Sequence, residues 1–238
     1  MSDDLYKRYT STSVFIGQDE KKLTDWSLKY FNHNILPHLP EDRGAVILDI
    51  GCGYGRYLLA LKEKDYKKVI GIDVSEEQVN YATKKLGLEN VTVADAIDVL
   101  NKETKEYDAV LLLDVIEHLE VDYSIQLLSK IYKSLKSGGV LILQAPNAIS
   151  PLAVHRHWDI THKRAYTVHS LEQSLMLAGF SQIQHYPLPP FIHNFKSVLR
   201  LMLWSGFINP LVKAYMLIAN GDRMGGVYTS NILSVAKR

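Results

Sequence analysis

Short apolar runs alternate with amphipathic segments along most of the chain, which predicts strands and helices in turn. Nearly continuous apolar runs have the length of strands that are buried on both faces of a parallel sheet, and they lie at residues 46–50, 69–73, 91–96, 107–114 and 137–143. Residues 228–236 instead alternate apolar and polar side chains, which predicts a final antiparallel strand. The pattern therefore predicts an α/β fold with a doubly wound, mostly parallel sheet and helices on both faces.

Helix boundaries follow from spacing and end signals. Apolar residues recur at helical spacing from Leu23 to Ile35 and predict a helix that leads into the sheet. Ser75, followed three residues later by Gln78, has the pattern of a capping box, and it predicts a helix to about residue 86 that Gly87 ends. The same device at Ser170 and Gln173 predicts a second capped helix, which ends at Gly179.

Composition indicates one ordinary domain. The chain has 238 residues, of which 47% are hydrophobic and 22% charged, enough for one extended core. A net charge of +1 is uninformative by itself, but the marked basic surplus of a protein that binds duplex nucleic acid through its phosphates is missing, so we expect no such partner. Cys52 is the only cysteine, and the first four residues, which include two aspartates, do not form a secretory signal, so we expect a cytoplasmic protein in a reducing compartment.

Residues 46–55 run from a buried strand into three glycines and predict a cofactor-binding turn. Gly51, Gly53 and Gly55 lack the Cβ atoms that would keep a ligand away from the backbone. A dinucleotide fingerprint needs its third glycine at position 56, where this chain has Arg56. Asp49 before the turn would repel a pyrophosphate but attract an ammonium group.

A second acidic residue indicates another part of the expected ligand. Asp73 ends the next buried strand, where a carboxylate accepts hydrogen bonds from ribose hydroxyls. Asp49 and Asp73 together predict a nucleoside joined to an amino acid.

At this point the chain resembles the class I S-adenosylmethionine-dependent methyltransferases. Five segments carry the resemblance in the family's order: residues 46–55, 69–73, 91–96, 107–114 and 137–143. The resemblance implies a seven-stranded Rossmann-like sheet with its last strand antiparallel, and S-adenosylmethionine as cofactor. It also implies that Asp95 reads the adenine amino group. The cofactor-binding residues that we expect on this basis are Asp49, Gly51, Cys52, Gly53, Asp73, Val74, Asp95, Ala96 and Asp114.

The domain organisation follows from the same resemblance. We expect a single methyltransferase domain over residues 1–238. Its expected parts are a helical cap at 1–40, a cofactor-binding core at 41–147, an acceptor-side loop and helical insertion at 148–227, and the final strand at 228–238.

Two clusters beyond the strand ends are candidates for catalysis. A sulfonium is already an activated electrophile, so the protein must mainly position the acceptor and supply a base if the acceptor is a hydroxyl. The clusters are residues 114–119 and the histidine-rich loop 155–164. His162 is the preferred general base, because imidazole titrates near neutral pH. His118 is the second choice, with a packing role as its alternative.

A metal site joins the two clusters in a further hypothesis. Asp114, Glu117, His118 and the distant His162 resemble the arrangement by which some methyltransferases of ubiquinone biosynthesis and of small-RNA ends hold a divalent ion. Asp114 replaces the usual glutamate in this pattern. A divalent ion at these oxygen and imidazole ligands would polarise an acceptor hydroxyl.

The acceptor is predicted from a broader resemblance. The string 159–162, the segment 165–171 and the tail 228–233 resemble methyltransferases found with bacterial surface-polysaccharide enzymes. This implies O-methylation of a sugar or glycan, with Trp158, Tyr166 and Phe191 as candidate stacking residues. A quinone-like or other small hydroxylated acceptor is the alternative. A cofactor-binding module without catalysis and an NAD-dependent oxidoreductase are hypotheses of other classes.

Residues 197–219 form a strongly apolar stretch. Arg200 and Lys213 confine its uncharged run to twelve residues, and Gly206 with the pair 209–210 predicts a break in any helix. We therefore expect no membrane span. Three interpretations remain, namely two short helices that cover the active site, which we favour, a dimer contact, or an interfacial membrane anchor. The protein is accordingly expected to be a monomer or a homodimer.

Overall fold

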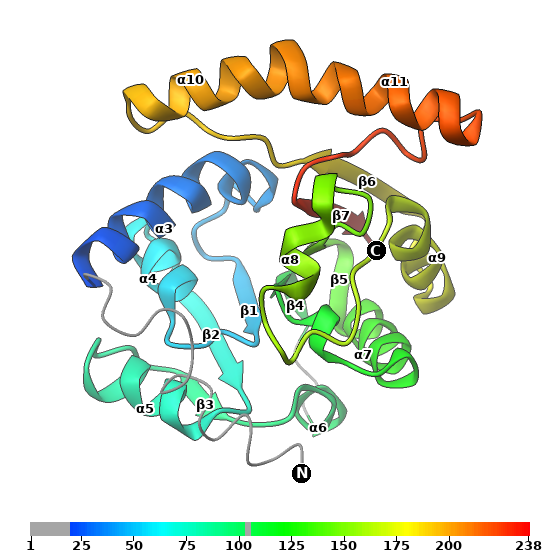
Figure 1. The fold of residues 1–238 in the computed structure, drawn as a ribbon. Helices are drawn as coiled ribbons and strands as arrows, with labels where there is room; N and C mark the ends of the chain where they lie inside the picture. Colours follow the sequence, from blue (N-terminus) through cyan, green and yellow to red (C-terminus); the bar gives the residue numbers. More distant parts are fainter. Residues whose placement is uncertain (1–19, 103–105) are drawn as a thin grey trace.

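The structure, a computed structural model, describes residues 20–102 and 106–238. Its centre is a seven-stranded sheet in the order β3-β2-β1-β4-β5-β7-β6 (Figure 1). The strands are β1 (Val46–Ile50), β2 (Lys68–Asp73), β3 (Val91–Val93), β4 (Tyr107–Leu113), β5 (Leu135–Pro146), β6 (Gln182–Pro187) and β7 (Asn231–Lys237). Strands β1 to β5 pair in parallel, and β7 runs antiparallel to both of its neighbours. The predicted fold class, including the antiparallel last strand, is confirmed.

Helices surround this sheet in the expected alternation. They are α3 (Glu20–Asn34), η1 (Leu36–His38), α4 (Arg56–Glu63), α5 (Glu76–Lys84), α6 (Ala96–Lys102), η2 (Ile116–His118), α7 (Val121–Ser134), η3 (Pro151–Ala153), α8 (Val154–His157), α9 (Val168–Ala178), α10 (Phe195–Leu203), η4 (Trp204–Ile208) and α11 (Asn209–Asn220). The predicted N-terminal cap at 1–40 is described only from residue 20, where α3 begins; its residues 1–19 lie outside the described part of the chain.

The two faces of the sheet build two cores from alternate residues of the same strands. Leu48, Val110 and Leu141 contribute to the core that α6, α7 and α9 cover. Their neighbours Ile47 and Ile142 contribute to the opposite core beneath α3 and α4. Both faces are therefore buried, which explains why these strands are apolar throughout rather than alternating.

The helix ends follow the predicted signals with two corrections, the first of which is that α5 ends at Lys84 with Lys85 as its C-cap, before the predicted Gly87. Ser75 is the N-cap of α5 and accepts a hydrogen bond from the Gln78 amide, and Gly179 caps α9 in the left-handed region. The capping box of α9, however, begins at Thr167 rather than at Ser170. Ser170 is its third helical residue, and its hydroxyl accepts from the Thr167 amide at 3.0 Å. The prediction was wrong because a serine serves at either position of a capping box.

Three predicted strands have different bounds, and the first of them, β5, runs over Leu135–Pro146 and so extends beyond the predicted 137–143 at both ends. β3 ends at Val93, and Ala96 already begins α6. The final strand begins at Asn231 rather than at 228, because Thr229 turns its hydroxyl to the Leu188 amide at 3.0 Å and to the Asn231 carbonyl at 2.7 Å. Tyr228 and Thr229 are buried, so their apolar and polar alternation reflects burial in a loop rather than strand pairing.

The apolar stretch near the C-terminus is one continuous helix, so the predicted break was wrong. Helices α10, η4 and α11 together run over residues 195–220, which we call the outer helix. Its middle, η4, is a π-helical turn in which the Asn209 amide donates to the Trp204 carbonyl. The proline at 210 follows directly as an early residue of α11, where its missing N–H is tolerated, and Gly206 weakens a helix without ending it.

Candidate active site at the carboxyl edge of the sheet

The glycine turn after β1 is held against the end of β2. The amides of Gly51 and Cys52 both donate to the Ile72 carbonyl, at 2.8 and 3.0 Å. Gly51 has φ +70°, and a Cβ on it would lie 2.4 Å from a methyl group of Val115, so only glycine fits there. The Gly53 amide then donates to Asp73 at 2.8 Å. The turn thus places Gly51, Cys52 and Gly53 beside Asp73. All four are among the residues that the sequence predicted to bind the cofactor.

Asp49 is buried beneath this turn, and one of its carboxylate oxygens lacks a partner. The side chain is 1% exposed, and Oδ2 has no hydrogen-bond donor among the described residues. Burial is the largest cause that raises the pKa of Asp49 to about 8; Arg56 lowers it and Asp73 raises it further. A buried carboxylate without a donor is costly, so this position fits a ligand that brings a cation or a donor.

Asp73 and Asp95 occupy the ends of the neighbouring strands. Asp73 accepts from the amides of Gly53 and Ser75, both at 2.8 Å, and burial raises its pKa. Asp95 caps α6 through the Ile97 amide at 2.9 Å and accepts from the Tyr123 hydroxyl at 2.6 Å. Asp95 thus has structural partners that the sequence did not reveal, and its contact with adenine stays a prediction.

The remaining predicted cofactor residues differ in exposure. Val74 is 55% exposed directly after Asp73, which leaves an apolar side chain beside the turn, whereas Ala96 is buried. Cys52 is also buried, and burial strongly raises the pKa of its thiol. This agrees with a small packing residue and not with a nucleophile, which would need a lowered pKa.

Asp114 lies at the end of β4 in a polar network that the sequence analysis missed. It has φ +58°, and its carboxylate accepts from Gln144 at 2.8 Å and pairs with Arg56 at 3.4 Å. Gln144 in turn accepts from the Tyr30 hydroxyl of α3. A glutamine inside the apolar run of β5 was the available signal, because buried amides need partners. The network connects α3, β5, the end of β4 and the first residue of α4, which follows the glycine turn.

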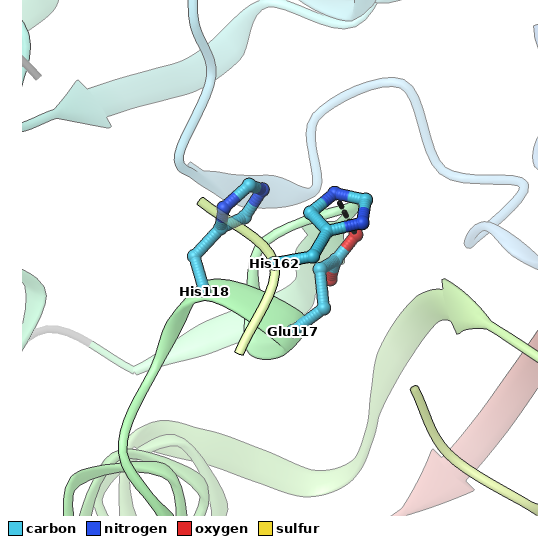
Figure 2. Close-up of side chains that lie close together, drawn as sticks. All are labelled: Glu117, His118 and His162. Carbon is cyan, nitrogen blue, oxygen red and sulfur yellow. Dashed lines mark ion pairs between the residues drawn. The ribbon is translucent and has the colours of Figure 1, made fainter. Parts of the chain in front are cut away.

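Glu117, His118 and His162 come together although 44 positions separate His118 from His162 in the sequence (Figure 2). One ligand atom from each lies within 4.8 Å of the others. Asp114, the fourth residue of the metal hypothesis, is not in this group, since Arg56 and Gln144 bind its oxygens. The sequence-based pairing of His162 with residues 117 and 118 is therefore observed, without the aspartate.

Glu117 is the electrostatic centre of this group. It is 1% exposed, and neither of its carboxylate oxygens has a hydrogen-bond partner among the described residues. Burial, and next the charge of Asp114, raise its pKa well above the usual range. His162 Nε2 lies 3.9 Å from Glu117 Oε1 and forms its ion pair when the imidazole is protonated (Figure 2).

Hydrogen bonds orient both histidine rings. Thr161 donates its only hydroxyl proton to Asp159 at 2.6 Å, so it accepts from His118 Nδ1 at 2.8 Å. The carbonyl of His155 accepts from His162 Nδ1 at 2.8 Å. Each ring therefore carries its proton on Nδ1 and its lone pair on Nε2. Burial, more than the neighbouring His162, lowers the pKa of His118 to about 4 and keeps that ring neutral.

This donor set suits two kinds of chemistry. An imidazole with a bonded Nδ1 and a basic Nε2 beside a carboxylate is the arrangement of a general base with its orienting group. Two such imidazoles and a carboxylate, each ring held by a second hydrogen bond, are also suitable ligands for a divalent ion. Thr161 and Asp159 were missed as positioning residues, and only their place in the polar loop indicated them.

The predicted loop 155–164 lies against this group, although its residues 155–157 are helical and belong to α8. The amides of Lys163 and Arg164 donate to the backbone carbonyl of Glu117, at 2.9 and 3.3 Å.

Of the three predicted stacking residues, Trp158 is 58% exposed, as a stacking residue requires. Tyr166 and Phe191 are buried, so the prediction that they stack on an acceptor was wrong. Phe191 packs instead in an aromatic cluster with Trp26, Tyr30, His33 and His193.

Known proteins are similar to this chain in part of its sequence and in its fold. A family model described as methyltransferase domain matches residues 21–185. A phosphoethanolamine N-methyltransferase of Plasmodium falciparum is 30% identical over 146 residues, which is 58% of this chain and 53% of that protein. A tRNA U34 carboxymethyltransferase of Desulfotalea psychrophila is 36% identical over 116 residues, 45% of this chain and 34% of that protein. The chain thus matches about half or less of the length of these curated relatives.

Solved structures agree on the architecture. A SAM-dependent methyltransferase from Archaeoglobus fulgidus superposes with a TM-score of 0.67 at 23% identity, over 90% of this chain and 94% of that one. The match of the family model to more than half of the chain, together with the glycine turn and the sheet order, decides the family. The chain belongs to the methyltransferase-domain family and carries an S-adenosylmethionine-dependent methyltransferase domain.

Proposed function

We propose that the protein is an O-methyltransferase that transfers the methyl group of S-adenosylmethionine to a hydroxyl, with a sugar or glycan as the preferred acceptor. The pairing of Glu117 with His162 supports this proposal, because a hydroxyl must lose its proton during methyl transfer. The curated relatives are named for N-methylation of phosphoethanolamine and for carboxymethylation of tRNA, so the methylated atom is inferred from this pair alone.

His162 and Glu117 have different roles in this proposal. When bound, S-adenosylmethionine would supply an activated methyl group, whose S–C bond would break as the new O–C bond forms. His162 Nε2 accepts the hydroxyl proton, while the His155 carbonyl holds the ring through Nδ1. Glu117 lies 3.9 Å from Nε2 and stabilises the imidazolium that results. The exposed Trp158 and the polar loop around it suit the hydroxyl-rich surface of a sugar.

Replacing the base tests this proposal. We expect His162→Ala to lower the rate of methyl transfer by roughly a hundredfold or more, since general-base catalysis contributes about that much. The measurement uses labelled S-adenosylmethionine with fractionated lysate of the native organism, followed by identification of the labelled product. Calorimetry with S-adenosylhomocysteine should show unchanged affinity, because His162 does not belong to the glycine turn.

His169→Ala is the matched control, since His169 is exposed on α9 and outside the group around Glu117. Equal loss in both variants, or full activity of His162→Ala, would refute the assignment of the base. A label found on a nitrogen atom would refute O-methylation.

A metal-assisted enzyme with a quinone-like or other small hydroxylated acceptor is the second candidate. The observation in its favour is that Glu117, His118 and His162 offer ligand atoms within 4.8 Å of one another, and that the Glu117 oxygens lack donors. A divalent ion there would hold the acceptor hydroxyl and lower its pKa. In that case thorough chelation abolishes methyl transfer, and Mg²⁺, Mn²⁺ or Zn²⁺ restores it. Unchanged activity after chelation removes this candidate and leaves His162 as the base.

A further inference from the structure

The outer helix, residues 195–220, packs little of itself against the domain. Ser197 is the only buried residue of this helix. The outer helix lies outside the layers of the fold (Figure 1). The favoured interpretation of this segment as two short helices is therefore wrong, and the exposure of its apolar side chains does not favour the predicted role as a cover of the active site. By length and composition this helix of 26 residues is apolar enough to cross a membrane, with a mean hydropathy of 1.4 over a window of 18 residues.

The outer helix has two distinct faces. A half-buried stripe is turned toward the domain and consists of Val198, Leu201, Trp204, Asn209, Val212 and Met216. These positions follow a helical period of three and four residues, and the extra residue of the π-turn η4 lies between Trp204 and Asn209. The π-turn thus keeps both halves of the stripe on the same side. The opposite face is exposed and apolar, with Phe195, Leu199, Leu203, Leu211 and Ile218 between 48% and 86% exposed.

Every charge on the outer helix is positive. Lys196, Arg200 and Lys213 are exposed, and no aspartate or glutamate occurs between residues 195 and 220. Long basic side chains keep their charged ends in water while their stems lie along an apolar surface. An apolar helix face with only cations beside it is complementary to an anionic lipid surface.

The connections at both ends exclude a membrane span. Val227 is buried in the domain, seven residues after the last helical residue, Asn220. Seven residues reach about 25 Å at full extension, which is less than the roughly 30 Å of a hydrocarbon core. At the other end, Phe191 is buried four residues before Phe195. Both ends must therefore lie on the same side of a bilayer, and the absence of a span is explained by these tethers and not by a helix break.

We propose that the outer helix docks the protein on an anionic lipid bilayer, lying in the plane of the interface with its exposed apolar face among the lipids. This inference goes beyond methyl transfer and does not depend on the acceptor. The complementary charge and the short tethers favour a bilayer over a second copy of the chain, because two copies that meet through this face would bring like charges together.

Sedimentation with vesicles tests the docking. We expect the full chain to bind vesicles of phosphatidylcholine with phosphatidylglycerol, and to bind vesicles of phosphatidylcholine alone far more weakly. Leu211→Glu should lower the partition coefficient at least tenfold. Leu177→Glu on α9 is its matched control, because Leu211 is 67% exposed and Leu177 is 66% exposed. Replacing Lys196, Arg200 or Lys213 by alanine should lower the partition coefficient roughly fivefold each.

A second variant separates docking from folding. In this variant a flexible Gly/Ser segment of 26 residues replaces the outer helix. The helix is about 39 Å long, and a flexible segment of the same number of residues can connect the same two ends. Because only Ser197 is buried, this variant should bind S-adenosylhomocysteine like the unaltered chain and lose vesicle binding. Failure of the unaltered chain to bind anionic vesicles would overturn the proposal. A dimer in lipid-free solution that Leu211→Glu dissociates, without vesicle binding, would assign the face to a second copy.

Discussion

Two buried carboxyl groups, those of Asp49 and Glu117, occupy different parts of the site and have the same property. Each side chain is 1% exposed and has at least one oxygen without a donor among the described residues. Burial raises the pKa of both. Burying such groups without a partner costs stability, so each position fits a positively charged partner. This partner would be a ligand ammonium group at Asp49, and an imidazolium or a metal ion at Glu117.

The pKa of Asp49 predicts how stability depends on pH. Folding raises this pKa from 3.8 to about 8, so the folded state holds a proton that the unfolded state has lost between these values. The contribution of Asp49 to the free energy of unfolding is therefore fully present below about pH 4 and is lost as pH rises toward 8. We expect Asp49→Asn to remove this decline, which urea denaturation of the ligand-free protein at pH 5 and pH 8 measures. The same decline in both proteins would contradict the assignment.

Cofactor binding should show the opposite trend at the same residue. A ligand ammonium favours the ionised carboxylate, so the affinity for S-adenosylhomocysteine is expected to rise as pH increases toward 8. The Asn variant should bind with a flatter pH profile. Calorimetry over this range gives the comparison with the stability measurement.

The sequence predicted several of these residues because their chemistry is local. Asp49 is the last residue but one of β1 and Asp73 is the last residue of β2, so their place at the strand ends followed from the apolar runs before them. Arg56, Gln144 and Thr161 were missed as contact residues, because their partners Asp114 and His118 lie at least 30 positions away in the sequence. No local pattern encodes such a contact.

At the scale of elements, the glycine turn depends on close packing as well as on backbone freedom. Gly51 and Gly87 both have positive φ, +70° and +61°, but a Cβ would clash only at Gly51. We expect Gly87→Ala to cost about 1 kcal/mol of the free energy of unfolding and Gly51→Ala clearly more. Gly51→Ala should also weaken S-adenosylhomocysteine binding. Urea denaturation and calorimetry measure the two effects, and equal costs would show that the contact with Val115 is unimportant.

Helix ends show where local rules suffice and where they fail. Ser75 and Gly179 act as predicted, because a cap satisfies backbone groups within one turn. The break predicted in the outer helix failed, because a single π-turn accommodates the proline and realigns the half-buried stripe. Whether the helix ends at this point or continues through a π-turn depends on what the half-buried stripe contacts. Those contacts are part of the tertiary structure.

At the scale of the whole molecule, the parallel sheet makes the site. Strands β1, β2 and β4 run in the same direction, so their carboxyl ends place the glycine turn, Asp73 and Asp114 along one edge. The loop after β5 then brings His162 onto Glu117 and His118. The outer helix lies outside these layers, so substitutions on its exposed face should affect lipid binding and leave the core intact.

The sequence by itself determined the fold class, the antiparallel last strand and the cofactor turn, because strand periodicity, glycine spacing and acids at strand ends are local consequences of burial and backbone geometry. Tertiary structure alone decided the bonding of Asp114, the tautomers of His118 and His162, and the exposure of the outer helix. These depend on which distant segments meet, and contact across the sheet is set by packing of the whole chain.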